Sequence, residues 1–299
     1  MEIASSVLMV RPARFGYDPE TAATNAFQHS PALDPAVVAL AEFDAAVAKL
    51  REFVNVVVVD EPEEDPQPDS IFPNNWFSTF PDGRICLYPM LSSRRQAEVR
   101  PSLLLTKLDD YAVTKVFDMR VGSVGALEGT GSLVLDHAHR AAFACLSPRT
   151  TPAMVEAWCR RFSYEPVIFE AVDEHGMPIY HTNVVLSICP HFVVAEEHLW
   201  ARPSLRERLG KAGRTVMPVT AAQTKMFCAN VLALRGRSGR PVLVLSTTAW
   251  KSFDEGQKNR LNLSFNSHIR VDIPTIEDVG GGGIRCMMAE LYLPGKLPL

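Results

Sequence analysis

A unit of β-hairpin, helix and strand recurs five times along the 299-residue chain, and this repeat limits the fold more than any other feature. Alternating apolar residues separated by Gly, Pro or Asp turns predict hairpins at 69–90, 131–147, 182–197, 229–250 and, pairing with 6–12, at 283–293. Apolar residues at helical spacing predict helices at 34–51, at 92–109 with a break at Pro101, and at 152–162, 197–211 and 250–262. Each helix leads into an apolar strand, at 53–60, 112–119, 166–172, 214–220 and 268–274. Five such units closing a ring would use residues 1–299 as one α/β domain, and an α/β sandwich without symmetry is the alternative.

The start of each hairpin carries a residue with polar or reactive chemistry. These residues follow one another at intervals of 47 to 59 positions, and they are Asp69, Glu128, His181, Cys228 and Cys286. In a ring, such positions converge on one central cleft. The shared position in successive units, more than any single motif, predicts a functional site there.

Cys286 is the strongest single candidate, because four glycines, Gly280–Gly283, lie shortly before it. A glycine run weakens a strand, but it lets the backbone approach a ligand closely and direct N–H groups toward it. Hydrogen-bond donors near a reachable thiol would lower its pKa. A buried cysteine beside a flexible loop is the alternative.

A cysteine nucleophile needs a histidine that the fold, rather than the sequence, brings within reach. Among eight histidines, His181 opens a hairpin, in Tyr-His-Thr-Asn, just before an apolar run. Glu128, in Leu-Glu-Gly-Thr-Gly-Ser, opens another and could orient the histidine as the third member of a triad. Taken singly, His181 fits a structural histidine and Glu128 a solvated turn acid. Asp69 and the Asn74–Asn75 pair likewise fit a turn, and only the repeat brings these residues together.

The composition excludes several classes of protein. Lys and Arg number 30 against 34 Asp and Glu, a formal net charge of −4, so nucleic acid is a poor partner. The longest apolar runs are far below the ~18 residues that a membrane-spanning helix needs, and the first residues lack a cationic targeting segment. Six cysteines without a CxxC pair suggest reduced thiols. We therefore expect a cytoplasmic protein without membrane contact; a homo-oligomer is neither required nor excluded.

No metal or cofactor is expected. The sequence has no HExxH or CxxC spacing, and the nearest cluster, Asp-His-Ala-His at 136–139, falls at a hairpin turn that we expect to be exposed. The four glycines are followed by neither the Lys-Ser/Thr of a phosphate loop nor the context of a dinucleotide fingerprint. The expected partner is a small-molecule substrate.

With these motifs in view, the sequence resembles the superfamily of amidinotransferases and arginine deiminases, which modify guanidino groups. The resemblance covers nearly the whole chain and is closest to the branch of citrulline utilisation hydrolases. It rests on the segments VLMVRPARF, ETAATNAFQ, DSIFPNNWFST, LEGTGSLVLD, LSPRT, YHTNVV, MFCANVLAL and GGGGIRCMMAEL. It implies a five-bladed, pseudo-symmetric ββαβ propeller, the pentein fold, around a central active site.

The resemblance also implies residue roles. Cys286 matches the family's nucleophile, His181 its general acid/base, and Glu128 the acid that orients the histidine. The implied reaction is attack of the thiol on the central carbon of a ureido or guanidino group. A covalent thiol intermediate would then be hydrolysed.

Further matches concern the substrate. Asp69 matches a substrate-holding acid of dimethylarginine hydrolases, and Arg94 and Arg149 match two arginines that clamp the substrate α-carboxylate. Two departures replace carboxylates near the guanidinium by amides, at Asn75 and Asn183, and Asn74 stands beside the first.

A buried cation prefers charged partners, whereas amides suit a neutral ureido group. The resemblance therefore favours citrulline, with ornithine, ammonia and carbon dioxide as products, over arginine.

Alternatives remain within and beyond this reaction. An amidinotransferase, an arginine deiminase or a dimethylarginine hydrolase would use the same residues on a guanidino substrate. A ribosome-binding member of the fold lacks this chemistry, and a papain-like protease carries its cysteine near the N-terminus, on a helix. The sequence assigns no role to Arg11 and Gln28, which could cap the cleft, or to Phe80, which stands where relatives often have His.

Overall fold

The structure is a computed structural model that describes residues 3–210 and 213–296. Its strands form five separate three-stranded sheets with one shared topology, in which a central strand pairs antiparallel with one neighbour and parallel with the other. The sheets are β15(Ala289–Leu291)–β1(Ser6–Arg11)–β2(Asn55–Asp60), β3(Phe77–Thr79)–β4(Arg84–Leu87)–β5(Lys115–Asp118), β6(Leu133–Asp136)–β7(Ala141–Cys145)–β8(Glu165–Phe169), β9(Leu186–Ile188)–β10(Phe192–Glu196)–β11(Thr215–Val219) and β12(Leu232–Arg235)–β13(Pro241–Ser246)–β14(Ser267–Val271). The predicted hairpins and the strands that follow the helices are confirmed, and five equal sheets fit the predicted five-fold repeat.

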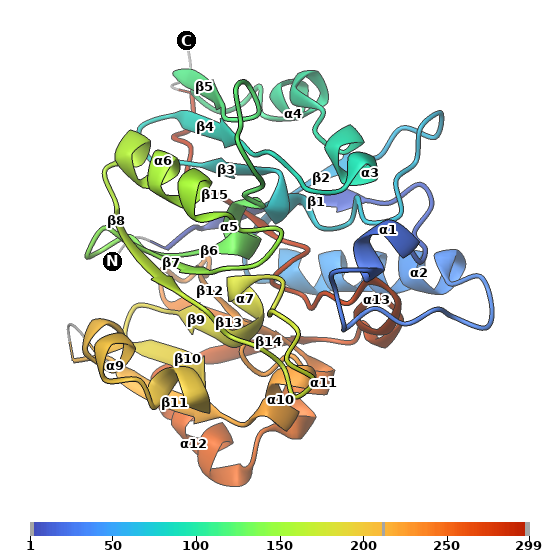
Figure 1. The fold of residues 1–299 in the computed structure, drawn as a ribbon. Helices are drawn as coiled ribbons and strands as arrows, with labels where there is room; N and C mark the ends of the chain where they lie inside the picture. Colours follow the sequence, from blue (N-terminus) through green and yellow to red (C-terminus); the bar gives the residue numbers. More distant parts are fainter. Residues whose placement is uncertain (1–2, 211–212, 297–299) are drawn as a thin grey trace.

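Helices connect the second strand of each sheet to the third (Figure 1). They are α2(Ala36–Arg51), α3(Ser93–Ala97) with α4(Pro101–Lys107), α6(Pro152–Phe162), α8(Glu197–Trp200) with α9(Pro203–Leu209), and α11(Thr247–Ser252) with α12(Glu255–Ser264). Three of the predicted helical segments are each divided in two. Pro101 begins a new helix after Arg100, Pro203 begins one after Arg202, and Asp254 caps one with its side chain. The predicted end at residue 211 lies outside the described residues.

The two ends of the chain meet in one sheet. Val7 of β1 pairs with Glu290 of β15, and Ser6 of β1 pairs with Asn55 of β2. One cavity is lined by residues of β3, β6, β9, β12 and β15, which are one strand from each sheet. These five strands, called the inner strands below, therefore face the same space. Helix α13(Pro274–Gly280), red in Figure 1, lies beside α2 and leads into the glycine run.

The inner strands begin later than the sequence predicts. One turn of helix precedes three of them, as η1(Pro73–Asn75), α5(Gly129–Ser132) and α7(Thr182–Val185), and residues 284–287 form a turn before β15. Cys286, which falls within the hairpin predicted at 283–293, lies instead in a turn, and Cys228 also lies in a turn. Gly129 shows why the backbone turns here: its φ is +48°, and a Cβ on it would lie 2.2 Å from the carbonyl oxygen of Asn74.

Apolar side chains pack between neighbouring sheets in five clusters. Trp158 of α6 is fully buried, and its Nε1 donates to the hydroxyl of Tyr88 at 2.8 Å, which satisfies the indole N–H inside the core. Within 3–210 and 213–296, no helix has the length and apolarity to cross a membrane. Two short helices, α1(Pro19–Ala22) and α10(Ala221–Lys225), lie in the remaining connections.

Candidate active site

The turns before the inner strands bring several predicted residues to one small cavity. The lining residues are Asn25, Asp69, Phe72, Asn75, Arg95, Arg149, Tyr180, His181, Gly280, Gly282 and Cys286.

Cys286 lies between two asparagine side chains. Its Sγ is 3.4 Å from Nδ2 of Asn230 and 3.7 Å from Nδ2 of Asn183, and Asn230 also donates to the carbonyl of Asn183 at 3.0 Å. Burial raises the pKa of the Cys286 thiol, while the Asn230 amide, the Arg285 charge and the Asn183 amide oppose that rise. The amides therefore offer N–H donors to a thiolate.

The five other cysteines are buried and do not line this cavity. Burial raises the pKa of each thiol, well above its ordinary value for Cys86 and to about 12 for Cys145, Cys159, Cys189 and Cys228. Such thiols stay protonated at neutral pH and are poor nucleophiles.

The glycine run allows protein side chains to approach the backbone beside Cys286. A Cβ on Gly282 would lie 2.9 Å from the ring of Phe72, and one on Gly283 would lie 2.6 Å from Oδ1 of Asn230. Gly281 has a φ of +61°, a conformation that other residues rarely adopt. The glycines therefore make room for side chains of the protein itself, and the predicted approach to a ligand stays a prediction.

His181 is held by Glu128. Nε2 of His181 is 2.7 Å from Oε2 of Glu128, and both side chains are buried. Burial lowers the pKa of His181 to about 4, although the hydrogen bond to Glu128 opposes this. The ring is therefore neutral at pH 7, Nε2 carries the hydrogen, and Nδ1 keeps its lone pair for proton transfer.

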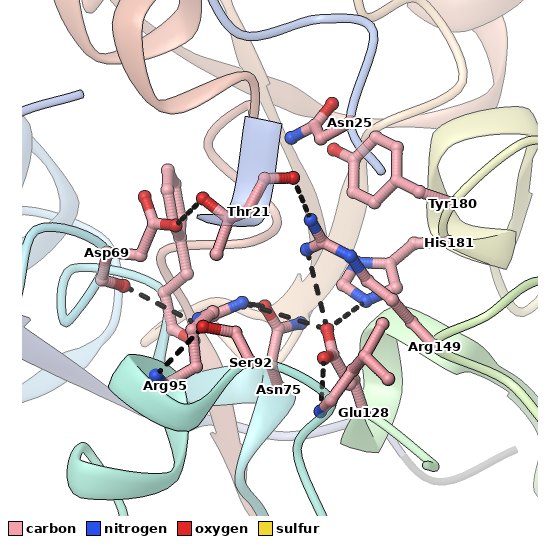
Figure 2. Close-up of polar contacts among 12 residues, drawn as sticks. Thr21, Asn25, Asp69, Asn75, Ser92, Arg95, Glu128, Arg149, Tyr180 and His181 are labelled. Carbon is pink, nitrogen blue, oxygen red and sulfur yellow. Dashed lines mark hydrogen bonds and ion pairs between the residues drawn. The ribbon is translucent and has the colours of Figure 1, made fainter. Parts of the chain in front are cut away.

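Glu128 stays ionised because positive charge surrounds it. Burial alone would raise its pKa, but the Arg149 charge first, then His181 and Arg95, bring it down to about 2. Nη1 of Arg149 is 3.6 Å and Nη1 of Arg95 is 3.8 Å from Oε2 of Glu128. Leu91 also donates its backbone N–H to Glu128 at 3.1 Å. Figure 2 shows these groups converging on the carboxylate.

Arg149 and Arg95 are also held by hydrogen bonds to groups other than Glu128. Arg149 donates from Nε to Oγ1 of Thr24 at 2.9 Å and from Nη2 to the carbonyl of Thr21 at 2.6 Å. Arg95 contacts Glu98 through Nε and Nη2, at 3.0 and 2.9 Å, and donates from Nη1 to Oδ1 of Asn75 at 2.7 Å. Fixed guanidinium planes of this kind suit the recognition of a carboxylate.

Asp69 is the one carboxylate among the described residues that line the cavity. Oγ1 of Thr21 donates to it at 2.8 Å, and Nε2 of Gln28 donates at 3.3 Å (Figure 2 shows the Thr21 bond). Burial raises the pKa of Asp69, and the Arg95 charge opposes the rise. The segment that carries Thr21 and Gln28 thus covers this side of the cavity.

Some predicted residues lie elsewhere. Arg94 is exposed, 3.9 Å from Asp18, and it lines a separate open cavity instead. Asn74 is buried behind Asn75, accepting its Nδ2 at 3.0 Å. Asn183 contacts Cys286 from outside the lining, whereas Asn75 lies within it.

The three residues to which the sequence assigns no role lie in different places, and of these Gln28 is the one that contacts the site. Gln28 contacts the site through Asp69 and through the carbonyl of Gly280. Arg11 instead pairs with Asp44 on α2, and Phe80 stacks on Phe162 in the core, with ring centroids 4.5 Å apart.

Sequence reasoning missed Arg95, Asn230 and Tyr180. Asn230 lies in MFCANVLAL and Tyr180 opens YHTNVV, two segments on which the resemblance rests, and their position there was the available signal. Arg95 lies outside those segments, directly after the predicted Arg94. The hydroxyl of Tyr180 donates a hydrogen bond to the carbonyl of Gly281 at 2.5 Å, and this bond holds the glycine run in place.

Residues 137–139 of the Asp-His-Ala-His segment lie in the predicted hairpin turn, with Ala138 and His139 exposed, but Asp136 ends β6 and departs from the prediction. Asp136 is buried, because Arg214 contacts it at 2.6 Å and His139 at 2.8 Å. Its oxygens are therefore engaged by protein groups. In the described part of the chain, the group of possible metal ligands that does come together is Glu196, Glu197 and His198, which is mostly exposed and apart from the cavity.

Comparison with protein families gives one match. The family model described as N,N dimethylarginine dimethylhydrolase, eukaryotic, matches residues 11–293. The chain therefore belongs to this family of hydrolases, within the superfamily of guanidino-modifying enzymes, and it is a hydrolase that acts on carbon–nitrogen bonds. A comparison with curated proteins gives no match.

Solved structures show the same fold at low identity. One of them is the N-terminal domain of ArgZ, an arginine dihydrolase from the ornithine–ammonia cycle in cyanobacteria, in a cysteine-to-serine variant bound to substrate. It aligns with a TM-score of 0.74 and 14% sequence identity, over 98% of this chain and 99% of that chain. Apo full-length ArgZ aligns with a TM-score of 0.75 and 15% identity, over 99% of this chain and 42% of that chain. A dimethylarginine dimethylaminohydrolase adduct with S-methyl-L-thiocitrulline aligns with a TM-score of 0.68 and 14% identity, over 97% and 100%.

Proposed function

We propose that residues 1–299 form one catalytic domain, a five-bladed pentein propeller, that hydrolyses the ureido group of citrulline. The observation that carries the proposal is the pair of amide side chains at the thiol, with Asn183 and Asn230 at 3.7 and 3.4 Å from Sγ of Cys286. A guanidinium placed there would be a buried cation without a carboxylate beside it. A ureido group is neutral, and amide side chains both donate to it and accept from it.

The amino-acid part of the substrate is assigned to the charged side of the cavity. Arg149 is fixed by Thr21 and Thr24 and is proposed to bind the α-carboxylate. Asp69 is proposed to bind the α-ammonium group. The exposed Arg94 would join the clamp only by moving toward this cavity, whereas Arg95 already lines it.

The catalytic roles are assigned to three residues. His181 takes the proton of the Cys286 thiol, and the thiolate attacks the ureido carbon. The bond from that carbon to the δ-nitrogen breaks as His181 gives this proton to the leaving amine. Ornithine leaves, and Cys286 carries an S-carbamoyl group. His181, oriented by Glu128, then takes a proton from water, which displaces the thiolate. The carbamic acid released decomposes to ammonia and carbon dioxide, so each citrulline consumes one water.

A second candidate is hydrolysis of the guanidino group of arginine. It is favoured by the family match to dimethylarginine hydrolases and by structural similarity to arginine dihydrolases. The same thiol attack would then produce an S-amidino intermediate if the side-chain amine left first. An amidinotransferase would pass that group to an amine rather than to water.

One experiment separates these reactions. The purified protein is given L-citrulline or L-arginine without an amine acceptor, and ornithine, citrulline and ammonia are quantified separately. We expect ornithine and ammonia from citrulline. Turnover of arginine much faster than citrulline refutes the substrate proposal. If ornithine forms from arginine only after an amine is added, and without ammonia, the protein is a transferase.

The nucleophile is tested in the same assay. Cys286→Ser is expected to abolish turnover while leaving the unfolding transition in place. Cys159→Ser, which removes a buried thiol of α6 outside the cavity, is the matched control and is expected to retain activity. Retained activity in Cys286→Ser would exclude the covalent route.

A further inference from the structure

A second cavity lies on the other side of the turn that carries the nucleophile. The inner strands of all five sheets line it, and its volume is about 30 Å³, which leaves room for a small group only. Arg285 lines this cavity, whereas its neighbour Cys286 lines the catalytic one. A group bound in the second cavity would therefore act on the residue adjacent to the nucleophile.

Arg285 carries hydrogen-bonding capacity that the fold does not use. The residue is only 5% exposed; its Nη1 donates to the carbonyl of Val231 at 3.2 Å, and its Nε has no hydrogen-bond partner among the described residues. A buried cation with an unmatched N–H donor is costly. The planar guanidinium suits a planar oxyanion, which can accept two parallel N–H bonds.

The other groups in this cavity limit the charge and size of the ligand. Glu290 also lines it, and its Oε1 accepts the hydroxyl of Tyr292 at 2.7 Å. Within the described residues, no ion pair joins Glu290 to Arg285. A carboxylate nearby disfavours a second or third negative charge on a ligand. Apolar walls from Phe77 and Leu133 leave little room for a large molecule.

We propose that this second cavity binds a small monovalent oxyanion, a carboxylate of formate size or bicarbonate, on the guanidinium of Arg285. The bound anion would act on catalysis through charge. The positive charge of Arg285 favours the thiolate of Cys286, so it lowers the pKa of that thiol. An anion that neutralises Arg285 removes part of this effect and slows attack by Cys286.

The test measures the thiol directly and needs no substrate. The full-length protein is treated with iodoacetamide between pH 6 and 10, and modification of Cys286 is followed by mass spectrometry. The ligand arms contain sodium formate or sodium bicarbonate, and the control arm contains sodium gluconate, too large for the cavity, at equal ionic strength. We expect saturable, several-fold slower alkylation below the thiol pKa with formate, with bicarbonate or with both, and none with gluconate. If neither small anion slows alkylation, the proposal is wrong.

Two variants locate the effect. Arg285→Gln is expected to remove the response to the anion, and a retained response would place the anion in the catalytic cavity and overturn the proposal. Glu290→Gln is expected to lower the formate concentration that gives half the effect, because it removes a nearby negative charge. An unchanged half-effect concentration overturns the proposal, even if Arg285→Gln does not fold.

Discussion

Replacing Glu128 by Gln tests the charge arrangement behind the catalytic histidine. The substitution keeps the shape and one acceptor oxygen but removes the negative charge. In the folded protein the pKa of Glu128 is about 2, against an ordinary value of 4.5. At about 1.4 kcal/mol per unit, the folded environment favours the ionised form by about 3 kcal/mol.

The pH dependence follows from the direction of this shift. The folded-state pKa of Glu128 is below the unfolded value, so its ionised form stabilises the fold above about pH 4.5 and loses this effect as pH falls toward 2. His181, with a pKa of about 4, is neutral in the folded protein from pH 5 to 8. We therefore expect Glu128→Gln to lower the free energy of unfolding by about 3 kcal/mol, equally at pH 5 and pH 8.

Urea unfolding at the two pH values measures this cost. Glu156→Gln is the matched control, because Glu156 lies on the surface of α6 and pairs with Arg160 at 3.6 Å. Its loss should cost less than about 1 kcal/mol. A cost below about 1 kcal/mol for Glu128→Gln would refute the electrostatic argument. A cost that grows between pH 8 and pH 5 would show that His181 is protonated in the fold, contrary to the neutral ring inferred here.

Other substitutions probe the rest of the site. Gly131→Ala places a Cβ 2.4 Å from Nδ2 of Asn75 and 2.7 Å from Nδ1 of His181, and urea unfolding should show a loss of about 1–3 kcal/mol. Gly16→Ala, with no atom within 4 Å of the added Cβ, should cost less. Asn230→Ala removes an N–H donor 3.4 Å from Sγ, so the pH profile of Cys286 alkylation should move to higher pH, and an unmoved profile contradicts that role. Arg149→Lys loses the fixed guanidinium, and the KM for citrulline should rise more than kcat falls; an unchanged KM would remove Arg149 from substrate binding.

The repeat was the most predictable part of the fold, because hairpin alternation and helical spacing are local patterns. The residues at which the inner strands begin were not predictable from local patterns. The segments around Asn75, His181 and Cys286 contain strand-forming residues, yet the backbone makes a turn there so that these side chains reach the cavity. Tertiary packing, such as Gly129 against the carbonyl of Asn74, decides that conformation.

The site was predictable as far as residue position in the repeat could identify it. Glu128 and His181 were expected together, and the structure places them 2.7 Å apart. Arg95 was missed because nothing in the sequence distinguishes it from Arg94. The Arg95 side chain points inward and is 2% exposed, whereas the Arg94 side chain points outward and is 55% exposed. Which of two adjacent residues faces a cavity depends on how a short helix is rotated, which five residues of sequence do not determine.

The distribution of charge around the cavity gives the strongest argument about the substrate. On one side Arg149 and Asp69 present one positive and one negative charge, which complement the α-carboxylate and α-ammonium groups of an amino acid. On the other side Asn183 and Asn230 surround Cys286 with neutral amides.

Glu128 does not serve as a partner for a substrate cation, since His181, the Leu91 N–H and two arginines already engage it. The proposed substrate, a zwitterionic amino acid with a neutral reactive end, would match both sides at once. A substrate with a cationic end would leave a buried positive charge beside the amides, at a cost that their dipoles offset only in part. The decisive comparison is therefore the ratio of kcat/KM for citrulline and arginine in the native protein and in Asn183→Asp. Restoring a carboxylate beside Cys286 should move that ratio toward arginine, and a ratio that does not change would show that charge near the thiol does not select the substrate.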